Sequence, residues 1–451
     1  MQQDLFTNKA LKKLIWPLLL EQLLALTVGL MDTVMVSSLG ETAVSGVSLV
    51  DMINVLFLNV FAALGTGGAV VAAQLLGAKD RRRACVSAGQ LYFVVTIISL
   101  TLSAVLLAVR APLLRLLFGA VEDSVMRSAL TYFTISIFSF PLLAIYNAGA
   151  SLFRAQGNSR VSMLIAVLVN AVNIIGNALM IYGLHQGVAG AALASLFARG
   201  VAAVAITVLL LDPAHTVSLR CGKAFRPDGA LIGRILSIGI PNSLENSLFQ
   251  LGRVLVVSMI TLFGTTQIAA NAVANNLDSI GILPGQAINL AMITVVGQCV
   301  GAGDAQQVRR MAKKLLRITY AALGATCLAT CLLCPLILRA YQLSADSLAL
   351  ALALVLIHCL CAIPLWPPSF TLPNALRAAG DVRFPMVCAI ASMALLRLGG
   401  GYVLSVQLQL GAIGIWIAMV ADWICRTVCF SLRFRGSKWL TFAPTLRRAQ
   451  T

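Results

Sequence analysis

The stretch that decides the fold runs from Leu14 to Leu39 and reads LIWPLLLEQLLALTVGLMDTVMVSSL. It is long enough to cross the hydrocarbon core of a bilayer, which takes ~20 apolar residues in a helix. Pro17 predicts a kink near its start, and Asp32 places an ionisable group inside it. An acid at that depth costs roughly 2.5 to 3.5 kcal/mol on insertion scales, so it rarely sits there without a partner or a task. Asp32 is therefore the leading candidate for a functional residue.

The composition extends this prediction to the whole chain. Of the 451 residues, 59% are hydrophobic and only 11% are charged, a balance typical of a polytopic membrane protein. Apolar runs separated by short polar breaks predict an all-α protein embedded in the lipid bilayer. We expect twelve transmembrane helices, at 14–39, 43–76, 86–110, 128–151, 160–182, 187–211, 231–263, 268–300, 315–339, 347–376, 384–405 and 409–432.

The net charge of +17 is explained by topology and not by nucleic-acid binding. Lys and Arg cluster in alternate connections, for example over 79–83, 220–234 and 309–317, and again in the tail after residue 432. Such asymmetry follows the positive-inside rule. It predicts a multi-pass protein of the inner (plasma) membrane with both termini in the cytoplasm.

The cysteines point to no metal or redox chemistry. Most of the eleven lie inside apolar runs without His or acidic residues at metal-ligand spacing, so we expect small core residues, no metal site and no cofactor. The first apolar run is too long for a cleavable signal peptide and lacks a small-residue cleavage site.

The sequence contains an internal duplication with an offset of 223 or 224 positions. Pro17 falls on Pro241, and the Gln-x-x-Gly-Ala-x-Asp segment 74–80 falls on 298–304. Farther on, residues 154–160 match 377–383, and Gly187 and Gly190 match Gly411 and Gly414. One unit of six helices has been used twice.

Because six is even, both copies enter the membrane from the same side, and an axis along the membrane normal should relate them. We expect an N-terminal lobe (10–211), a cytoplasmic linker (212–230), a C-terminal lobe (231–432) and a basic cytoplasmic tail (433–451). A central cavity between the lobes, and alternating access by rocking of one lobe against the other, follow as expectations. A single chain with two lobes suffices as a monomer.

The repeated turns have a local explanation. Gly77 and Gly301 can end their helices by adopting positive φ, and the Asp and Arg residues behind them can bind turn backbone and neighbouring helix ends. The alternative is that these arginines only hold the topology.

These motifs resemble the multidrug and toxic compound extrusion (MATE) family of cation-coupled exporters. The resemblance rests on Met31-Asp32-Thr33 after Pro17, the paired Gln-x-x-Gly-Ala-x-Asp turns, LFRAQGNSR at 152–160 and GAIGIW at 411–416. It covers about residues 10 to 435. It implies two six-helix lobes in a V and export of bulky organic cations against inward flow of protons or sodium ions.

The resemblance also implies an ion-coupling site. The family's first-helix acid corresponds to Asp32, and a polar cluster in its archaeal and DinF-like branch corresponds to Tyr132, Asn173, Asn177 and Ser195. That branch has an acid at the position of Asn177. The NorM-like branch has a tenth-helix acid where this chain has Trp366 and a seventh-helix glutamate for which Glu245 is the nearest candidate, so the chain stands between the two branches.

Asp32 near amide and hydroxyl groups suits two kinds of coupling. A carboxyl group in a cavity that is alternately closed and open to water can take up and release a proton. The same oxygens are hard ligands for Na⁺. A hydrogen-bond network that does not cycle is the alternative. Asn170, Asn173 and Asn177 share one face of the fifth helix, where interhelical hydrogen bonding explains them as well as an ion site does.

Other polar residues within the predicted spans are candidates for lining the substrate cavity. Asp51 in the second helix, and Asn275 and Asp278 in the eighth, occupy broadly equivalent stretches, and Gly281 and Pro284 predict a bend beside them. Trp366 precedes Pro367 and Pro368 in a broken helix, where it can stack on a flat cation or simply pack. The candidates for the substrate cavity are Asp51, Glu245, Asp278, Asn275 and Trp366.

Charged residues within the spans should be paired. Arg253 lies two turns from Glu245, and a fixed ion pair with Glu245 or another acid is its expected role. Asp422 and Arg426 at i, i+4 should form a pair, whereas the sequence does not assign counter-ions to Arg199 and Arg397. His358 reads as a core residue more readily than as a proton relay.

Together these features predict a secondary active multidrug efflux transporter that exports small organic cations by antiport with H⁺ or Na⁺. The alternatives are a flippase for a lipid-linked anionic precursor and a narrow-specificity metabolite exporter. An enzyme would need a converging nucleophile, base or metal ligands, which three dispersed histidines do not supply. The two-lobed duplication disfavours a passive channel.

Overall fold

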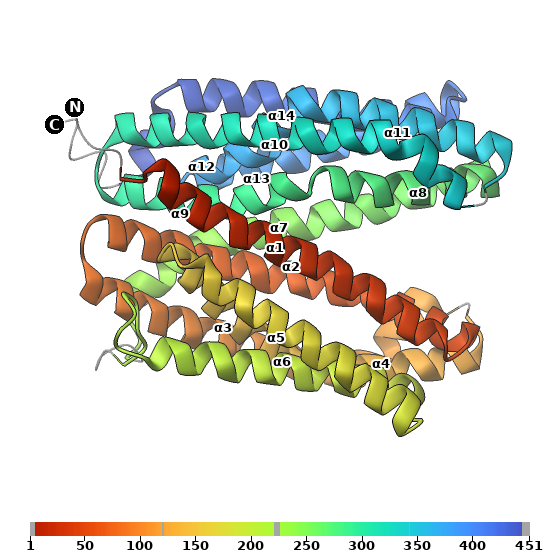
Figure 1. Ribbon diagram of the computed structural model, residues 1–451, viewed down its shortest axis with the longest axis horizontal. Coiled ribbons are helices and arrows are strands. Elements are labelled where there is room, and N and C mark those ends of the chain that lie inside the picture. The colour runs from red at the N-terminus through yellow and green to blue at the C-terminus, as the bar shows by residue number, and fades with distance from the viewer. Residues whose placement is uncertain (1–4, 120, 221–225, 342, 444–451) are drawn as a thin grey trace. The chain divides into compact units, whose positions relative to one another are not determined.

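The computed structural model describes residues 5–119, 121–220, 226–341 and 343–443, and within these ranges it consists of helices and connecting turns (Figure 1). Twelve of the described helical stretches are long and apolar enough to cross a membrane, which confirms the predicted all-α fold and span count. Large apolar side chains cover their outer surfaces; Leu116, Leu332 and Leu395 are 83%, 74% and 72% exposed. Such a surface is stable only against lipid or another apolar partner.

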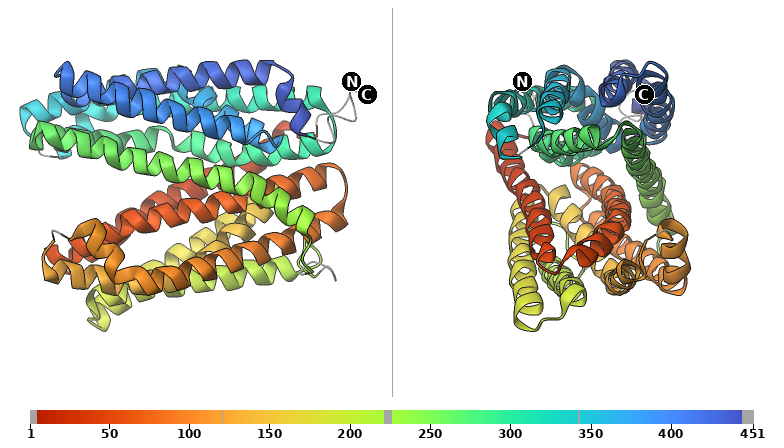
Figure 2. Two further views of the ribbon diagram at one scale, coloured as in Figure 1. Left: turned by 180° about the vertical axis from the view of Figure 1, so that it is seen from behind. Right: turned by 90° about the vertical axis from the view of Figure 1, so that its right-hand side faces the viewer.

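The chain divides into two compact units, Asn8–Ser243 and Leu244–Thr451 with the first residues of the chain. We call them the N-terminal and C-terminal units. Helices of the N-terminal unit are α1 (Asn8–Ser37), α2 (Glu41–Gly77), α3 (Arg81–Phe118), α4 (Asp123–Ala155), α5 (Ser159–Asn177), the π-helical η1 (Ala178–Gly183), α6 (Gly187–Leu211) and the first part of α7 (Gly229–Ile260). Among them α5 and α6 lie side by side (Figures 1 and 2).

The C-terminal unit contains the rest of α7 and the second set of helices. These are η2 (Thr261–Phe263), α8 (Thr265–Gly281), α9 (Leu283–Gly301), α10 (Ala305–Ala340), α11 (Ala345–Trp366), η3 (Pro367–Thr371), α12 (Leu372–Ala378), α13 (Arg383–Ser392), η4 (Met393–Gly400), η5 (Val403–Gln407), α14 (Gly411–Arg435) and η6 (Lys438–Phe442). The eighth predicted helix is divided at Ile282, next to Gly281 and Pro284, and the tenth passes through π-helical turns at Pro367 and Pro368.

The division between the units falls inside α7 and not in the linker 212–230. The first part of α7 packs closely on α2: an added Cβ at Gly67 would lie 2.6 Å from the Ile235 carbonyl oxygen, and the Ser243 hydroxyl donates to the Val60 carbonyl (3.2 Å). The linker is bound to the same unit, because Gln90 donates to the Arg226 carbonyl (2.8 Å). The boundary therefore follows packing and not the polar composition of the linker.

The duplication is visible in the backbone. Positive φ values recur at pairs of positions 223 or 224 residues apart: Gly40 and Gly264, Lys79 and Gly303, Gly157 and Gly380, His185 and Gln409, and Gly187 and Gly411. Asp80 and Asp304 both cap the next helix, each accepting a hydrogen bond at 2.9 Å from the backbone N–H three residues on. The two halves therefore repeat their turns as well as their spans.

The prediction of positive φ at Gly77 and Gly301 is wrong, although both helices do end there. The left-handed residue comes two positions later, at Lys79 and Gly303. In the first copy the Lys79 N–H donates to the Leu76 carbonyl and the Asp80 N–H to the Leu75 carbonyl. In this Schellman pattern Gly77 is the last helical residue and Ala78 is the C-cap. Lys79 is the C′ residue that follows the C-cap, and this is the residue that adopts the left-handed conformation.

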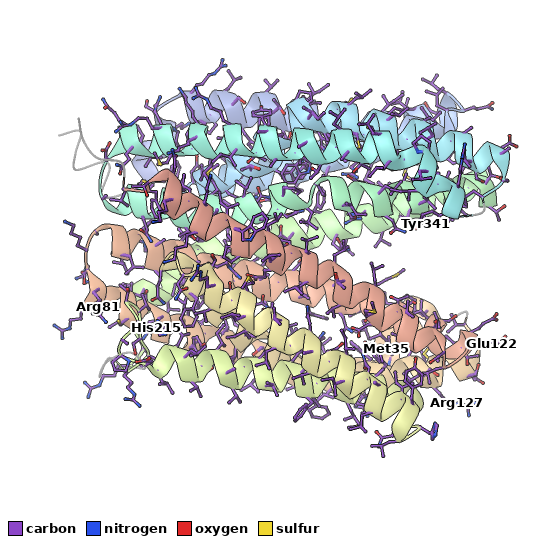
Figure 3. The ribbon with its side chains drawn as sticks, in the orientation of Figure 1. Met35, Arg81, Glu122, Arg127, His215 and Tyr341 are labelled. Carbon is purple, nitrogen blue, oxygen red and sulfur yellow. The ribbon has the colours of Figure 1, made fainter. Side chains whose placement is uncertain are left out.

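The polar ends of the N-terminal unit fit an even number of crossings. Arg81, after the second span, donates through Nη2 to the His215 carbonyl in the linker at 2.8 Å. Arg81 and His215 lie at one end of this unit, and Met35, Glu122 and Arg127 lie at the other (Figure 3). The connection after the second span and the one after the sixth are thus on the same side.

Candidate functional site

Asp32 lies near the C-terminal end of α1, where it meets the end of α5. The Asn177 amide donates to Asp32 Oδ1 at 2.7 Å. Asn177 is the last residue of α5, directly before the π-helical η1, and its side chain is buried. π-Helical turns occur frequently at functional sites because they reorient side chains along a helix.

A chain of amide and hydroxyl groups supports this contact. Asn177 Nδ2 also lies 3.3 Å from Asn173 Oδ1, and Asn173 in turn donates to the Ser195 hydroxyl of α6 at 3.1 Å. Because both neighbours of Asn177 Nδ2 are acceptors, the amide orientation is fixed. One turn earlier, Asn170 donates to the Leu24 carbonyl of α1 at 3.2 Å. The asparagine face of α5 therefore points at α1 and α6.

A cavity of about 140 Å³ opens beside Asp32 within the N-terminal unit, and its lining is mostly polar. Asp51 of α2 shares this cavity, so two candidates that the sequence placed in different sites lie in one. The Asn54 amide donates to Asp51 Oδ1 at 3.2 Å. The residues lining the cavity include Asp32, Asp51, Ser48, Thr33, Tyr132, Asn177, Ser195 and Arg199. Asn173 supports the wall from behind Asn177.

Arg199 is the one charged residue lining this cavity, within the described part of the chain, to which the sequence assigned no site. It donates to the Ser139 hydroxyl at 2.5 Å, and Asp32 and Asp51 both attract it. The spacing of four residues from Ser195 puts it on the same face of α6, which was the available signal. The cavity therefore combines two carboxylates with one fixed guanidinium.

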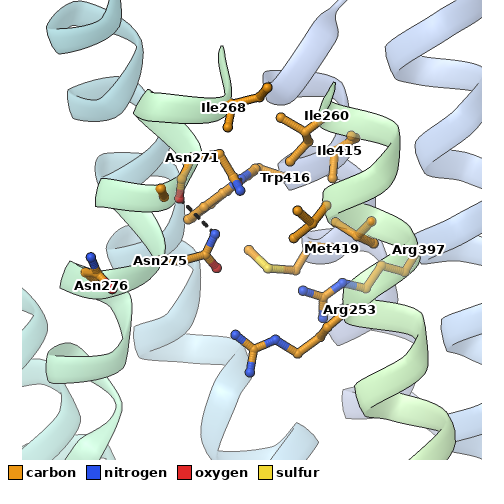
Figure 4. A pocket seen from close by; sticks show the side chains of 13 residues that line it. Arg253, Ile260, Ile268, Asn271, Asn275, Asn276, Arg397, Ile415, Trp416 and Met419 are labelled. Carbon is orange, nitrogen blue, oxygen red and sulfur yellow. Dashed lines mark hydrogen bonds between the residues drawn. The ribbon is translucent and has the colours of Figure 1, made fainter. Parts of the chain in front are cut away.

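The C-terminal unit has a larger cavity of about 330 Å³, with a different charge. It is lined by α7, α8, η4 and α14, and its charged side chains are Arg253 and Arg397 (Figure 4). The predicted substrate residue Asn275 lies on its wall, where its amide donates to the Asn271 carbonyl at 2.8 Å. No carboxylate is among the described residues that line this cavity.

Glu245 is bound to another arginine and lies outside the lining of that cavity. The Arg377 guanidinium donates to Glu245 Oε1 at 2.5 Å, and both side chains are mostly buried. The matching positions of the first repeat form the same pair, because Arg154 donates to Glu21 Oε1 at 2.9 Å. Arg253 was expected to form a fixed ion pair with Glu245 or with another acid. Glu245 instead pairs with the repeated arginine of the loop motif, and no acid among the described residues pairs with Arg253.

Asp278 and Trp366 also lie away from the lining of the larger cavity. Asp278 Oδ1 is 2.5 Å from His358 Nε2, and His358 packs edge-on against two tryptophans of α14. Trp366 is 2% exposed and stacks on Phe370, with ring centroids 5.2 Å apart. Their proposed contacts with substrate stay predictions.

The predicted pair of Asp422 and Arg426 is confirmed. Arg426 Nε donates to Asp422 Oδ1 at 2.8 Å, and the Asp422 side chain is fully buried. Arg426 also donates to the Ser392 hydroxyl at 3.1 Å and lies over the Phe249 ring. The charge of Asp422 is therefore balanced by an arginine of its own helix.

Among the residues that the structure describes, no three His, Cys, Asp or Glu side chains converge as metal ligands. Chemically, the cavity beside Asp32 can hold a proton on a carboxylate or a small cation against oxygen ligands. The cavity beside Arg397 presents positive charge and an aromatic wall. The two cavities therefore suit opposite kinds of charge.

The chain resembles proteins of known family over nearly its whole length. A family model described as MatE matches it twice, over residues 17–179 and 241–403. The uncharacterized transporter YisQ of Bacillus subtilis is 27% identical, over 98% of this chain and 99% of that protein. A probable multidrug resistance protein NorM of Thermotoga maritima is 26% identical, over 96% and 93%. A crystal structure of MATE in complex with MaL6 has the same fold, with a TM-score of 0.89 at 22% identity over 96% of each chain.

Proposed function

The chain belongs to the MATE family of multi-pass membrane transporters, and from this premise we propose that it exports small organic cations in exchange for inward-moving protons. The observation that carries the proposal is the Asp32 carboxylate, held by Asn177 at the edge of a polar cavity that also contains Asp51 and Arg199. The members of this family are transporters and not enzymes.

Asp32 is the proposed coupling residue because its two oxygens have different surroundings. Oδ1 accepts the Asn177 amide, which stays a donor whether or not the carboxyl group is protonated. The carboxyl group also lines the cavity, where a proton or a cationic substrate can reach it. Proton binding and cation binding then compete for the same negative charge, which is the requirement for antiport.

Arg199 favours the proton over Na⁺ as the coupling ion. Its guanidinium lines the same cavity and is attracted by both carboxylates, so part of their negative charge is already balanced, at a cost to the binding of an added Na⁺. A proton avoids this cost because it neutralises one carboxylate without adding a separate ion. Sodium coupling through Asp32, Ser195 and the amide oxygens is the alternative that the experiment below distinguishes.

The proposed orientation places both termini in the cytoplasm of the cell whose plasma membrane holds the protein. Its support is the clustering of Lys and Arg in alternate connections. The Arg81 contact with the linker supports it further, because it brings two of these basic connections to one side. We propose that the chain works as a monomer.

The experiment is efflux of a fluorescent organic cation, ethidium, from cells expressing the full chain, with the sodium and pH gradients varied separately. A membrane potential of 100 mV supplies ~2.3 kcal/mol per net charge moved, enough for a roughly 50-fold gradient of a neutral solute. A one-for-one exchange of a proton for ethidium moves no net charge, so the pH gradient alone drives it. Asp32→Asn should lower the ethidium gradient toward equal concentrations inside and outside the cell, at an unchanged amount of the protein in the membrane. The matched control Asp123→Asn, at the exposed start of α4, should leave it intact.

Each outcome decides one part of the proposal. Collapse of wild-type efflux when the pH gradient is removed, with no response to sodium, supports proton coupling. Full activity of Asp32→Asn makes Asp32 structural and moves coupling to Asp51. If the wild type exports no organic cation, a narrow metabolite exporter becomes the better account; a lipid-linked precursor flippase is not favoured by the multidrug resistance relatives.

A further inference from the structure

The larger cavity of the C-terminal unit has the size and lining of an organic-ligand site. Its volume of about 330 Å³ lies at the lower end of the range for small-molecule pockets, roughly 300 to 1,000 Å³. Figure 4 shows Arg253 and Arg397 extending from neighbouring helices toward the space that Asn275 faces. Trp416 and Met419 of α14 also line the cavity.

The two arginines have no ion pair or hydrogen bond of their own within the described part of the chain. The acids that would neutralise them are engaged elsewhere: Glu245 with Arg377, Asp422 with Arg426, and Asp278 with His358. Arg397 Nε is buried without a hydrogen-bond partner. An unsatisfied buried guanidinium nitrogen costs free energy that a bound acceptor would recover.

The electrostatic balance around Arg397 leaves positive charge in excess. Asp422 and Asp278 attract it, whereas Arg253 and Arg426 repel it. Among these side chains, Arg397 included, three arginines face two aspartates. A bound anion adds the missing negative charge, and a bound cation would add to the repulsion.

The rest of the wall selects for an aromatic body attached to that anion. The Trp416 indole donates to Asn271 Oδ1 at 3.0 Å, which fixes both side chains. Val256, Ile260 and Met419 make the neighbouring surface apolar. A planar guanidinium matches the two oxygens of a carboxylate, and a ring beside it can bury its faces against Trp416.

We propose that this cavity binds the carboxylate of an aromatic organic anion, with Arg253 and Arg397 on the carboxylate and Trp416 beside the ring. The site extends the ligands of the protein beyond organic cations. It does not depend on the coupling ion or on Asp32, because all its residues belong to the C-terminal unit.

The test is isothermal titration of the purified full-length chain in detergent with three probes that share one ring system. These are 2-naphthoate, the neutral 2-naphthamide and the cationic 2-naphthylmethylammonium. We expect 2-naphthoate to bind at least about tenfold more tightly than the other two, since only it pairs with the arginines. Equal affinities for all three probes would overturn the proposal.

Variants locate the binding. Arg397→Gln should lower the affinity for 2-naphthoate at least about tenfold and leave the affinity for 2-naphthamide unchanged. Arg397→Lys should have an affinity for 2-naphthoate between those of Arg397→Gln and the wild type. Arg339→Gln, an exposed arginine at the end of α10 in the same unit, makes the same change in net charge and should have no effect. If Arg397→Gln does not fold, Arg253→Gln serves in its place.

Two further results would contradict the assignment. An unchanged affinity in a folded Arg397→Gln protein would place the anion elsewhere. Displacement of 2-naphthoate by inorganic phosphate at equal concentration would show a site for small anions and not one for an aromatic carboxylate. Failure of this proposal would leave ethidium export and its Asp32 dependence untouched, because those are measured separately.

Discussion

The ion pair of Glu245 and Arg377 offers a quantitative test of how the repeated loop arginines stabilise the protein. The two side chains are 10% and 8% exposed, and their contact distance is 2.5 Å. Arg377 also donates to Asn374 Oδ1 at 2.7 Å. Removing one partner of a buried pair costs ~3–5 kcal/mol, because the other charge is left uncompensated. Since Arg377 keeps Asn374, we expect the lower end, about 3 kcal/mol for Glu245→Gln.

A double-mutant cycle isolates the interaction. Arg377→Met should also cost about 3 kcal/mol, whereas the double variant should cost less than about 3 and far less than the sum of about 6, because neither charge is then left unpaired. The free energy of unfolding would be measured by SDS titration of the purified protein in mixed micelles, followed by circular dichroism. Additive losses in the double variant would refute the reasoning.

The first repeat supplies the matched comparison. Glu21 accepts from Arg154 at 2.9 Å and also from the Ser162 hydroxyl at 2.8 Å. Glu21→Gln should therefore cost less, about 2 kcal/mol, since the second bond survives. Glu41→Gln, at the exposed start of α2, should change the unfolding free energy by less than about 0.5 kcal/mol.

Two further predictions concern the packing of α9 and the coupling ion. Gly285→Ala should lower the unfolding free energy by about 1–3 kcal/mol in the same titration, because its Cβ would lie 2.2 Å from the Trp366 ring. Gly281→Ala should cost less, because the nearest neighbour of its Cβ would be 3.4 Å away. Equal losses in the two variants would contradict this packing argument. Arg199→Gln removes the guanidinium that faces Asp32, so ethidium efflux should become responsive to a sodium gradient while Arg199→Lys stays unresponsive; no sodium response in Arg199→Gln would mean that this charge does not select the ion.

Some features of the candidate site could be predicted from the sequence because they depend on neighbours along one helix. Asn173 and Asn177 share a face at a spacing of four, and the structure joins them to Ser195 and Asp32. Arg199 stands four residues after Ser195 and was within reach of the same argument.

Partners across helices were not predictable in this way. Asp51 and Asp278 occupy broadly equivalent stretches of the repeats, yet Asp51 shares the cavity of Asp32 whereas Asp278 lies beside His358. Glu245 is eight residues from Arg253 but pairs with Arg377, which is 132 positions away. Such pairs depend on how each helix is rotated about its axis, and one sequence does not contain that information.

The sequence by itself determined the twelve spans, the twofold use of one six-helix unit and the breaks at Pro284 and Pro367. These follow from hydropathy, chain length and backbone chemistry, which act over a few neighbouring residues. Only the tertiary structure decided which charges meet, where α7 divides between the units, and that the C-terminal cavity is lined by Arg253 and Arg397. In a membrane the apolar exterior fixes where helices lie but tolerates many rotations. Polar contacts in the interior select one of them.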